Sequence, residues 1–204
     1  MKKKIQLKQR KENLRKERKL FLIICEGEKT ERFYFKEFRE RNNGIRIEVP
    51  NCSYTDPVNL VRFANKIKSA YDIDLKRGDS IWCVFDADLN NDDMIKKARS
   101  EAGRDKIEII LSNPSFELWY LLHFEFTTAF MSADQVLQKL KNGYIPFYQK
   151  NKSIFDRLKP HLSRAIENAR KLNGYHENNQ TPVFSTLSNP STQVFKLVQQ
   201  WSLC

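Results

Sequence analysis

The first half of the chain alternates between short, almost continuous apolar runs and longer segments in which apolar residues recur with helical spacing. Four strands are predicted, at 19–25, 45–49, 80–85 and 106–111, and the one at 45–49 is recognised by alternating apolar and polar residues and not by a continuous run. Runs of this length are typical of strands that are buried on both faces. Because helical segments separate them, the sequence predicts an α/β fold with a mostly parallel four-stranded sheet flanked by helices.

Capping residues mark the expected helices of this half. The segment 29–41 follows the first run, and Gly44 is expected to stop its helix. Asp56 before Pro57 is typical of a helix start, with an N-cap and a proline at the first helical position. Asp92 or Asp93 is expected to cap a third helix, which ends near Gly103.

The second half predicts helices and loops without a further strand. Asn113-Pro114 and Asn189-Pro190 are each expected to start a helix, and another helix is expected to end at Gly174. No structure is assigned to 142–157 and 175–189. We therefore expect three parts: a basic N-terminal arm, an α/β core, and a helical part packed on that core, at 1–19, 20–112 and 113–204.

Charge is concentrated at the N-terminus. The chain carries a formal net charge of +11, and residues 1–19 contain ten Lys and Arg residues against two glutamates. Such an arm suits the phosphate backbone of nucleic acid, although a solvated tail that aids solubility explains the composition equally well. The cations expected to contact phosphate are Lys2, Lys3, Lys4, Lys8, Arg10 and Lys11.

Composition excludes several classes of protein. Of the 204 residues, 40% are hydrophobic, which is enough to build a core. No apolar run approaches the roughly 20 residues of a membrane helix, and no signal peptide is visible. The four cysteines form no C-x-x-C pair, so we expect reduced thiols in a cytoplasmic protein without a membrane partner. Neither a P-loop nor a G-x-G-x-x-G motif occurs.

Acidic residues follow two of the expected strands. Glu26 and Gly27 come directly after the first strand, and Asp86 and Asp88 follow the third. Alternate residues share a face of a strand, and parallel strands place their carboxyl ends at one edge of the sheet. Glu26, Asp86 and Asp88 should therefore converge. Three carboxylates with few nitrogen or sulfur ligands nearby suit Mg²⁺ or Mn²⁺, so the sequence predicts a divalent-metal site.

Polar residues beside this edge extend the candidate site. Glu117 lies in a segment that is apolar nearly all round, so it must be paired, protonated or bound to metal. It is a candidate catalytic or metal-site residue, or else it only fixes the packing of its helix. His123 is a candidate general acid, or a structural histidine. Lys29 and Thr30 fall at an expected helix start, where free N–H groups favour phosphate.

Four motifs together resemble one known family. "ICEGEKTERFYF", "VFDAD", "SNPSFELWYLLHF" and "NPSTQVFKLV" occur in order over most of 20–201 and resemble the RloB family of bacterial and archaeal genomes. The Glu-Gly and Asp-x-Asp pairs also resemble the TOPRIM domain of topoisomerases, primases and OLD-type nucleases. The resemblance implies a TOPRIM/Rossmann-like sheet, a divalent metal, phosphodiester chemistry, and an association with phage-defence and restriction loci.

By this resemblance, Glu26 is a general base or acid and a metal ligand, and Asp86 and Asp88 bind the metal. Many TOPRIM proteins have a third acid two positions beyond the pair, where this chain has Asn90. A second metal is therefore left open.

Three functions are consistent with these residues. The first is a metal-dependent nuclease that acts on DNA or RNA in antiviral defence, with a possible partner protein from a defence locus. The second is a non-catalytic sensor that binds a metal–nucleotide complex or nucleic acid. The third is a phosphotransferase or phosphatase that acts on a small nucleotide.

Overall fold

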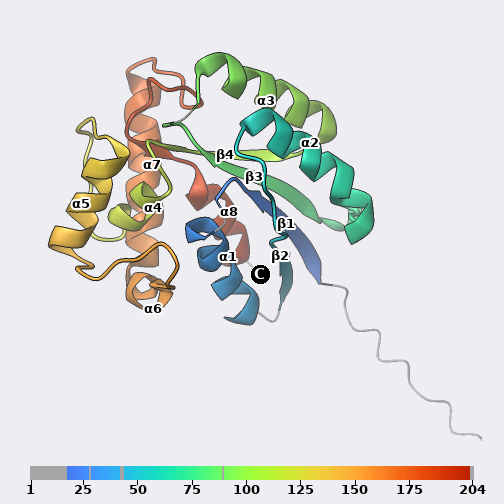
Figure 1. Ribbon diagram of the computed structural model, residues 1–204, viewed down its shortest axis with the longest axis horizontal. Helices are drawn as coiled ribbons and strands as arrows, with labels where there is room; N and C mark the ends of the chain where they lie inside the picture. Colours follow the sequence, from blue (N-terminus) through green and yellow to red (C-terminus); the bar gives the residue numbers. More distant parts are fainter. Residues whose placement is uncertain (1–17, 28, 42–43, 89, 203–204) are drawn as a thin grey trace, which may run out of the picture.

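The computed structural model describes residues 18–27, 29–41, 44–88 and 90–202, and it contains one five-stranded sheet (Figure 1). The strands run in the order β2-β1-β3-β4-β5, in which β1 to β4 are parallel and β5 is antiparallel to β4. The predicted α/β class and mostly parallel sheet are confirmed. The strands are β1 Lys19–Cys25, β2 Ile45–Glu48, β3 Ser80–Asp86, β4 Glu108–Asn113 and β5 Ser191–Thr192.

Eight α-helices are present among the described residues, and three short 3₁₀ turns lie at 68–71, 75–77 and 159–161. The helices are α1 Thr30–Arg41, α2 Pro57–Ile67, α3 Asp92–Asp105, α4 Glu117–Leu122, α5 Ala133–Gly143, α6 Phe155–Leu158, α7 Leu162–Asn178 and α8 Val194–Ser202. Most of the second half is therefore helical, as predicted.

Capping explains where the first helices begin. Asp56 caps α2 as predicted, because its carboxylate accepts a hydrogen bond from the Asn59 backbone N–H at 2.8 Å. Helix α3 is capped one residue earlier than predicted: the side chain of Asn91 accepts from the Met94 N–H at 3.0 Å. Asp92 and Asp93 instead occupy the first turn of α3, where negative charge is favourable.

Alternate side chains of the central strands point to opposite faces of the sheet and pack into two separate hydrophobic cores. Leu22 and Ile24 of β1 pack with α2 and α3 on one face of the sheet. Phe21 and Ile23 belong to the core on the other face, which includes residues of α1, α4 to α8 and the loops between them. Helices thus cover both faces, and the interiors of β1 and β3 are fully buried. A fully buried side chain of this kind contributes roughly 1.5–3 kcal/mol.

Both Asn-Pro pairs differ from the prediction. Asn113 is the last residue of β4 and not a helix N-cap, and its side-chain amide donates to the Ser185 and Thr186 carbonyls at 3.1 and 3.0 Å. Asn189-Pro190 precedes β5, so α8 starts only at Val194. Both Asn-Pro peptide bonds are cis. The expected helix starts at these two positions are wrong, and α7 continues past Gly174 to Asn178.

The strand β5 is a further correction, because no strand was expected after 113. The Ser112 and Thr192 hydroxyls lie 2.9 Å apart across the β4–β5 pair. The Gln193 side chain accepts from the Leu111 N–H at 3.0 Å. The C-terminal part therefore completes the sheet as well as packing on it. Its Trp201 ring lies 5.9 Å from the Phe21 ring in the shared core.

Two further expectations concern the ends and the environment. Lys19, which closes the basic arm, is also the first residue of β1, as the predicted strand at 19–25 requires, and residues 1–17 lie outside the described part of the chain. Over the described ranges, no helix is both long enough and apolar enough to cross a bilayer. Cys25, Cys52 and Cys83 are buried free thiols.

Candidate functional site

The strand order creates a topological switch point between β1 and β3. From β1 the chain passes to β2 on one side, and it then crosses to β3 and β4 on the other. Open α/β sheets bind ligands in the crevice outside the carboxyl ends of the strands at such a point. Glu26 follows the carboxyl end of β1, and Asp86 forms the carboxyl end of β3.

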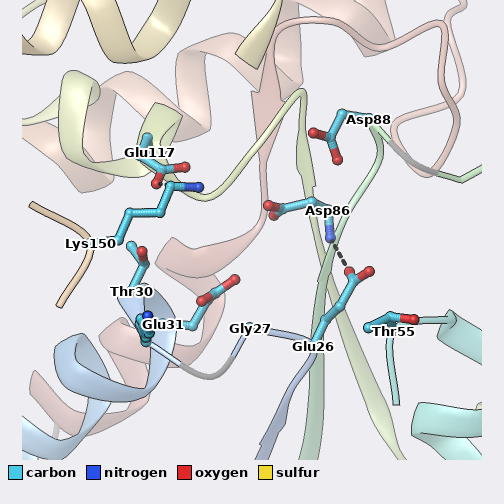
Figure 2. Close-up of a pocket in the computed structure, with 10 residues that line it drawn as sticks. Glu26, Gly27, Thr30, Glu31, Thr55, Asp86, Asp88, Glu117 and Lys150 are labelled. Carbon is cyan, nitrogen blue, oxygen red and sulfur yellow. Dashed lines mark hydrogen bonds and ion pairs between the residues drawn. The ribbon is translucent and has the colours of Figure 1, made fainter. Parts of the chain in front are cut away.

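A pocket of about 340 Å³ lies at this position (Figure 2). It brings together six of the predicted site residues: Glu26, Lys29, Thr30, Asp86, Asp88 and Glu117. It also contains Gly27 of the Glu-Gly pair and three residues that the sequence did not indicate: Glu31, Thr55 and Lys150. Among the described residues that line it, five are carboxylates and two are lysines. The pocket is therefore strongly acidic.

The backbone of the two central strands fixes Glu26 and Asp86 relative to each other. The Glu26 N–H donates to the Val84 carbonyl at 3.0 Å, which extends the pairing of β1 with β3 by one residue. The Asp86 N–H donates to Glu26 Oε2 at 3.0 Å. The carboxylate of Asp86 is left to face the pocket, and its Oδ1 is buried without a hydrogen-bond partner. A buried acceptor of this kind is costly unless a cation or a proton meets it.

Asp88 reaches the pocket although the strand has already ended. The strand β3 ends at Asp86, so Asp88 belongs to the following turn and its direction is not set by strand alternation. The Asp88 N–H donates to the Pro114 carbonyl at 3.2 Å. The Asn90 side-chain amide donates to the Asp86 carbonyl at 2.7 Å, so Asn90 holds the turn together and does not line the pocket.

Glu31 explains the glycine that follows Glu26. It lies in the first turn of α1, is only 6% exposed, and folds its carboxylate against Gly27. A Cβ atom at position 27 would lie 2.6 Å from Glu31 Cδ, far inside contact distance. Gly27 therefore makes room for a second carboxylate beside Glu26. The signal in the sequence was an acid in the first turn of the helix that follows the Glu-Gly pair.

Glu117 is buried and paired, as its apolar helix predicted. Ser115 Oγ donates to Glu117 Oε2 at 3.0 Å, and the Tyr148 hydroxyl donates to Oε1 at 3.1 Å. The Lys150 ammonium lies 3.4 Å from the same Oε1. The Tyr148 hydroxyl also lies 3.4 Å from Thr30 Oγ1, so this network joins the 148–150 loop to α4 and α1.

His123 is not brought to the pocket. It is 1% exposed, and its Nδ1 lies 2.8 Å from the Trp119 carbonyl, which can only accept a hydrogen bond. Its ring packs edge-on against the Trp119 ring, at 4.9 Å between centroids. Burial lowers the pKa of His123 to about 4, so its imidazole is neutral near pH 7. This is the environment of a structural histidine.

Three of the clustered carboxyl groups have raised pKa values when no cation is bound. Burial, with a smaller effect from Glu31 and Asp88, raises the pKa of Glu26 to about 7. Burial and then the Glu117 charge raise the pKa of Glu31 to about 7, against the opposing effect of Lys150. Burial raises the pKa of Asp86 well above its usual value, and its four acidic neighbours, Glu31 first, add to this effect. The pocket therefore favours either proton uptake or a bound cation.

The donor set fits Mg²⁺ or Mn²⁺ held by a small number of carboxylates. In the part of the chain that the structure describes, no three His, Cys, Asp or Glu side chains are arranged to hold an ion together. Mg²⁺ does not need three protein ligands, since it commonly keeps several water ligands and is bound by one or two carboxylates. The unpartnered Asp86 Oδ1 and the hard oxygen lining match that requirement. The metal assignment of Glu26, Asp86 and Asp88 stays a prediction.

The arm residues lie outside the described part of the chain. Lys2, Lys3, Lys4, Lys8, Arg10 and Lys11 all fall within residues 1–17, so their predicted contact with phosphate stays a prediction. Lys29 and Thr30, by contrast, line the pocket at the start of α1.

The fold and the pocket define an α/β protein with an acidic, lysine-flanked site at the switch point of a parallel sheet. The chain belongs to the family described as RloB-like protein, whose family model matches residues 21–200. The resemblance to this family found from the four motifs is thus confirmed. Neither the curated proteins nor the solved structures yield a match to this chain.

Proposed function

We propose that this protein is a divalent-metal-dependent phosphodiesterase of the TOPRIM type that cleaves nucleic acid in a restriction-associated, antiviral setting. The observation that carries the proposal is the convergence of Glu26, Asp86 and Asp88 on one pocket at the switch point. Membership of the RloB-like family supports the restriction-associated role.

Asp86 and Asp88 are the residues that would hold the metal, since two carboxylates suffice for Mg²⁺ and no three of the described acids are arranged around one ion. When bound, Mg²⁺ or Mn²⁺ polarises the phosphoryl group and stabilises the leaving oxygen. The unpartnered Asp86 Oδ1 supports this assignment, because a cation is the partner that it lacks.

The residues of the chain accept the proton of the attacking water and position the phosphate. Glu26 is the candidate base, since its carboxylate lines the same pocket as the two aspartates that would hold the metal. Lys29 and the N-terminus of the 12-residue helix α1 provide positive charge for the phosphate. Lys150 provides positive charge from the opposite wall of the pocket, where its ammonium group contacts Glu117. Glu117 holds Lys150 and Tyr148 in place.

The size of the pocket favours a second candidate function, which is action on a small nucleotide or binding of one. Its volume of about 340 Å³ falls in the range of small-molecule sites. A phosphatase, phosphotransferase or sensor of a small nucleotide would use the same residues. The strongly basic first 19 residues favour a polymeric substrate over this alternative.

One experiment separates these functions. The full chain is incubated with labelled single- and double-stranded DNA and RNA, and with a nucleoside triphosphate, in Mg²⁺, Mn²⁺ or EDTA. We expect cleavage of the polymer only with metal, and none by the Asp86→Asn/Asp88→Asn variant. Asp93→Asn/Asp134→Asn is the matched control, because it removes two exposed aspartates from the first turns of α3 and α5, outside the pocket.

Two results would overturn the proposal. One is nucleotide turnover without polymer cleavage, which would favour the second candidate. The other is the absence of Mg²⁺ and Mn²⁺ binding in calorimetry at millimolar concentration, with and without nucleic acid.

A further inference from the structure

The loop that carries Lys150 lines two pockets. Lys150 faces the acidic pocket, whereas Phe147 and Lys152, on either side of it in sequence, line a second pocket of about 250 Å³. Neighbouring Cα atoms are about 3.8 Å apart, so a ligand extended along this loop can contact both pockets.

The exposed position of Phe147 is imposed by the backbone. Residues 145–148 form a turn, closed by the Tyr148 N–H donating to the Ile145 carbonyl at 3.0 Å. Both ends of the turn are anchored, because the Ile145 and Tyr148 side chains are each 4% exposed. Phe147 between them is 89% exposed, the highest value among the large hydrophobic residues of the described chain. The turn therefore presents an aromatic ring to solvent beside the candidate site.

The second pocket has the composition of a nucleobase site. Phe147 provides an aromatic face, and Ile145 and Ile154 provide apolar wall. Ser153 and Asp156 bring hydrogen-bonding groups of the kind that the edge of a base requires. Lys152 and Arg157 add positive charge for an adjoining phosphate. A single exposed phenylalanine is ordinary, but here it stands beside hydrogen-bonding groups and two cations, and together these groups match the parts of a nucleotide.

We propose that the pocket lined by Phe147, Lys152 and Arg157 binds an unpaired nucleotide of the substrate, whose base stacks on Phe147 while a neighbouring phosphate enters the acidic pocket beside Lys150. The proposal rests on the proposed function for the role of the acidic pocket. A base in a duplex already stacks on its neighbours, so only a single-stranded or locally unpaired strand offers a free face to Phe147. The site thus selects single strands.

Binding in EDTA tests this without cleavage. Fluorescence anisotropy measures the affinity of the full chain for a labelled single strand, for its duplex, and for an abasic strand of equal length. The buffer contains raised salt, because salt weakens the phosphate contacts of the basic arm and so leaves the contribution of stacking easier to measure. We expect Phe147→Ala to weaken single-strand binding by roughly 5- to 150-fold, the range measured when a stacking aromatic is removed.

The controls isolate stacking. Phe147→Trp should retain single-strand affinity, because a tryptophan ring stacks at least as well. Phe130→Ala should have no effect, since Phe130 is also a well-exposed phenylalanine (76%) but lines neither pocket. Binding of the abasic strand should be insensitive to Phe147→Ala, because that strand has no base to stack.

The base site at Phe147 and the proposed metal-dependent cleavage can be refuted independently of each other. If Phe147→Ala binds the single strand as tightly as the parent does, or weakens the abasic strand and the duplex equally, the base site is refuted, whether or not metal-dependent cleavage is seen. If the parent protein binds no oligonucleotide, the base site is also refuted, and contact with a protein partner then becomes the explanation for the exposed Phe147 ring. If the binding pattern holds but no metal supports cleavage, the proposed function falls and the base site stands.

Discussion

Replacing Glu31 by glutamine should stabilise the metal-free protein at alkaline pH. Glu31 is 6% exposed and lies beside other carboxylates, and its pKa is raised to about 7 from an ordinary 4.5. The folded state therefore holds this proton more tightly than the unfolded chain does. Between these two pKa values the folded state binds more protons, so stability falls as pH rises. The cost is absent below about pH 4.5 and fully present above about pH 7.

The size of the effect follows from the shift in pKa. A shift of one pKa unit is equivalent to about 1.36 kcal/mol, so ionising Glu31 in the folded state costs at most about 3 kcal/mol. The substitution also removes a favourable charge from the first turn of α1, typically worth 0.3–1 kcal/mol. We therefore expect Glu31→Gln to gain about 2 kcal/mol at pH 8. For a chain of this size, that raises the melting temperature by about 4–8 °C.

Thermal unfolding in EDTA between pH 4.5 and pH 8.5 provides the measurement. The parent should lose stability across this range, and Glu31→Gln should lose less, by about 2 kcal/mol at pH 8, because Glu26 with its pKa of about 7 still ionises in the variant. Glu177→Gln, an exposed glutamate of α7, serves as the control and should follow the parent. Identical pH profiles for the parent and Glu31→Gln would refute the reasoning, because they would mean that the Glu31 carboxylate is solvated or already compensated in the folded state.

Three further predictions concern the same site and the arm. Gly27→Ala should weaken Mg²⁺ binding in calorimetry at least several-fold by displacing the Glu31 carboxylate, and unchanged affinity would contradict this. Glu117→Gln keeps an acceptor for Ser115 and Tyr148 but loses the Lys150 charge pair, so metal-dependent activity should fall; full activity with a lower melting temperature would leave Glu117 a purely structural role. Deleting residues 1–17, which spares β1, should flatten the salt dependence of nucleic-acid binding by roughly 0.7–0.9 in slope per lost phosphate contact, and an unchanged slope would identify the arm as a solubility tail.

The sheet was predictable where hydrophobicity alone decides the structure. The predicted strands carry apolar residues continuously in β1 and β3 and in alternation with polar ones in β2, and both patterns are typical of strands at this length. The strand β5 was missed because it is only two residues long and consists of serine and threonine. Its pairing with β4 depends on hydroxyl and backbone contacts across some 80 residues of sequence, which no local pattern encodes.

The site was predictable where topology decides which residues meet. Glu26 and Asp86 end neighbouring parallel strands, so their convergence follows from the fold class. Lys150 was missed because it reaches the pocket from a loop that only tertiary packing places there. His123 was proposed because it is close to Glu117 in sequence. Six residues advance about 240° around a helix axis, which turns it away from the pocket.

The way in which the segment between β4 and β5 is attached has a kinetic consequence. This segment carries Glu117, Lys150 and Phe147, and both of its ends join strands that pair with each other. Because β4 and β5 are paired, the two stems of this segment are held side by side, and a movement of the whole segment would have to bend the chain at both stems. Side chains such as Lys150 can move without disturbing that pairing. We therefore expect the first response to a ligand to be a change of side-chain conformation at Lys150, on the nanosecond timescale of exposed side chains.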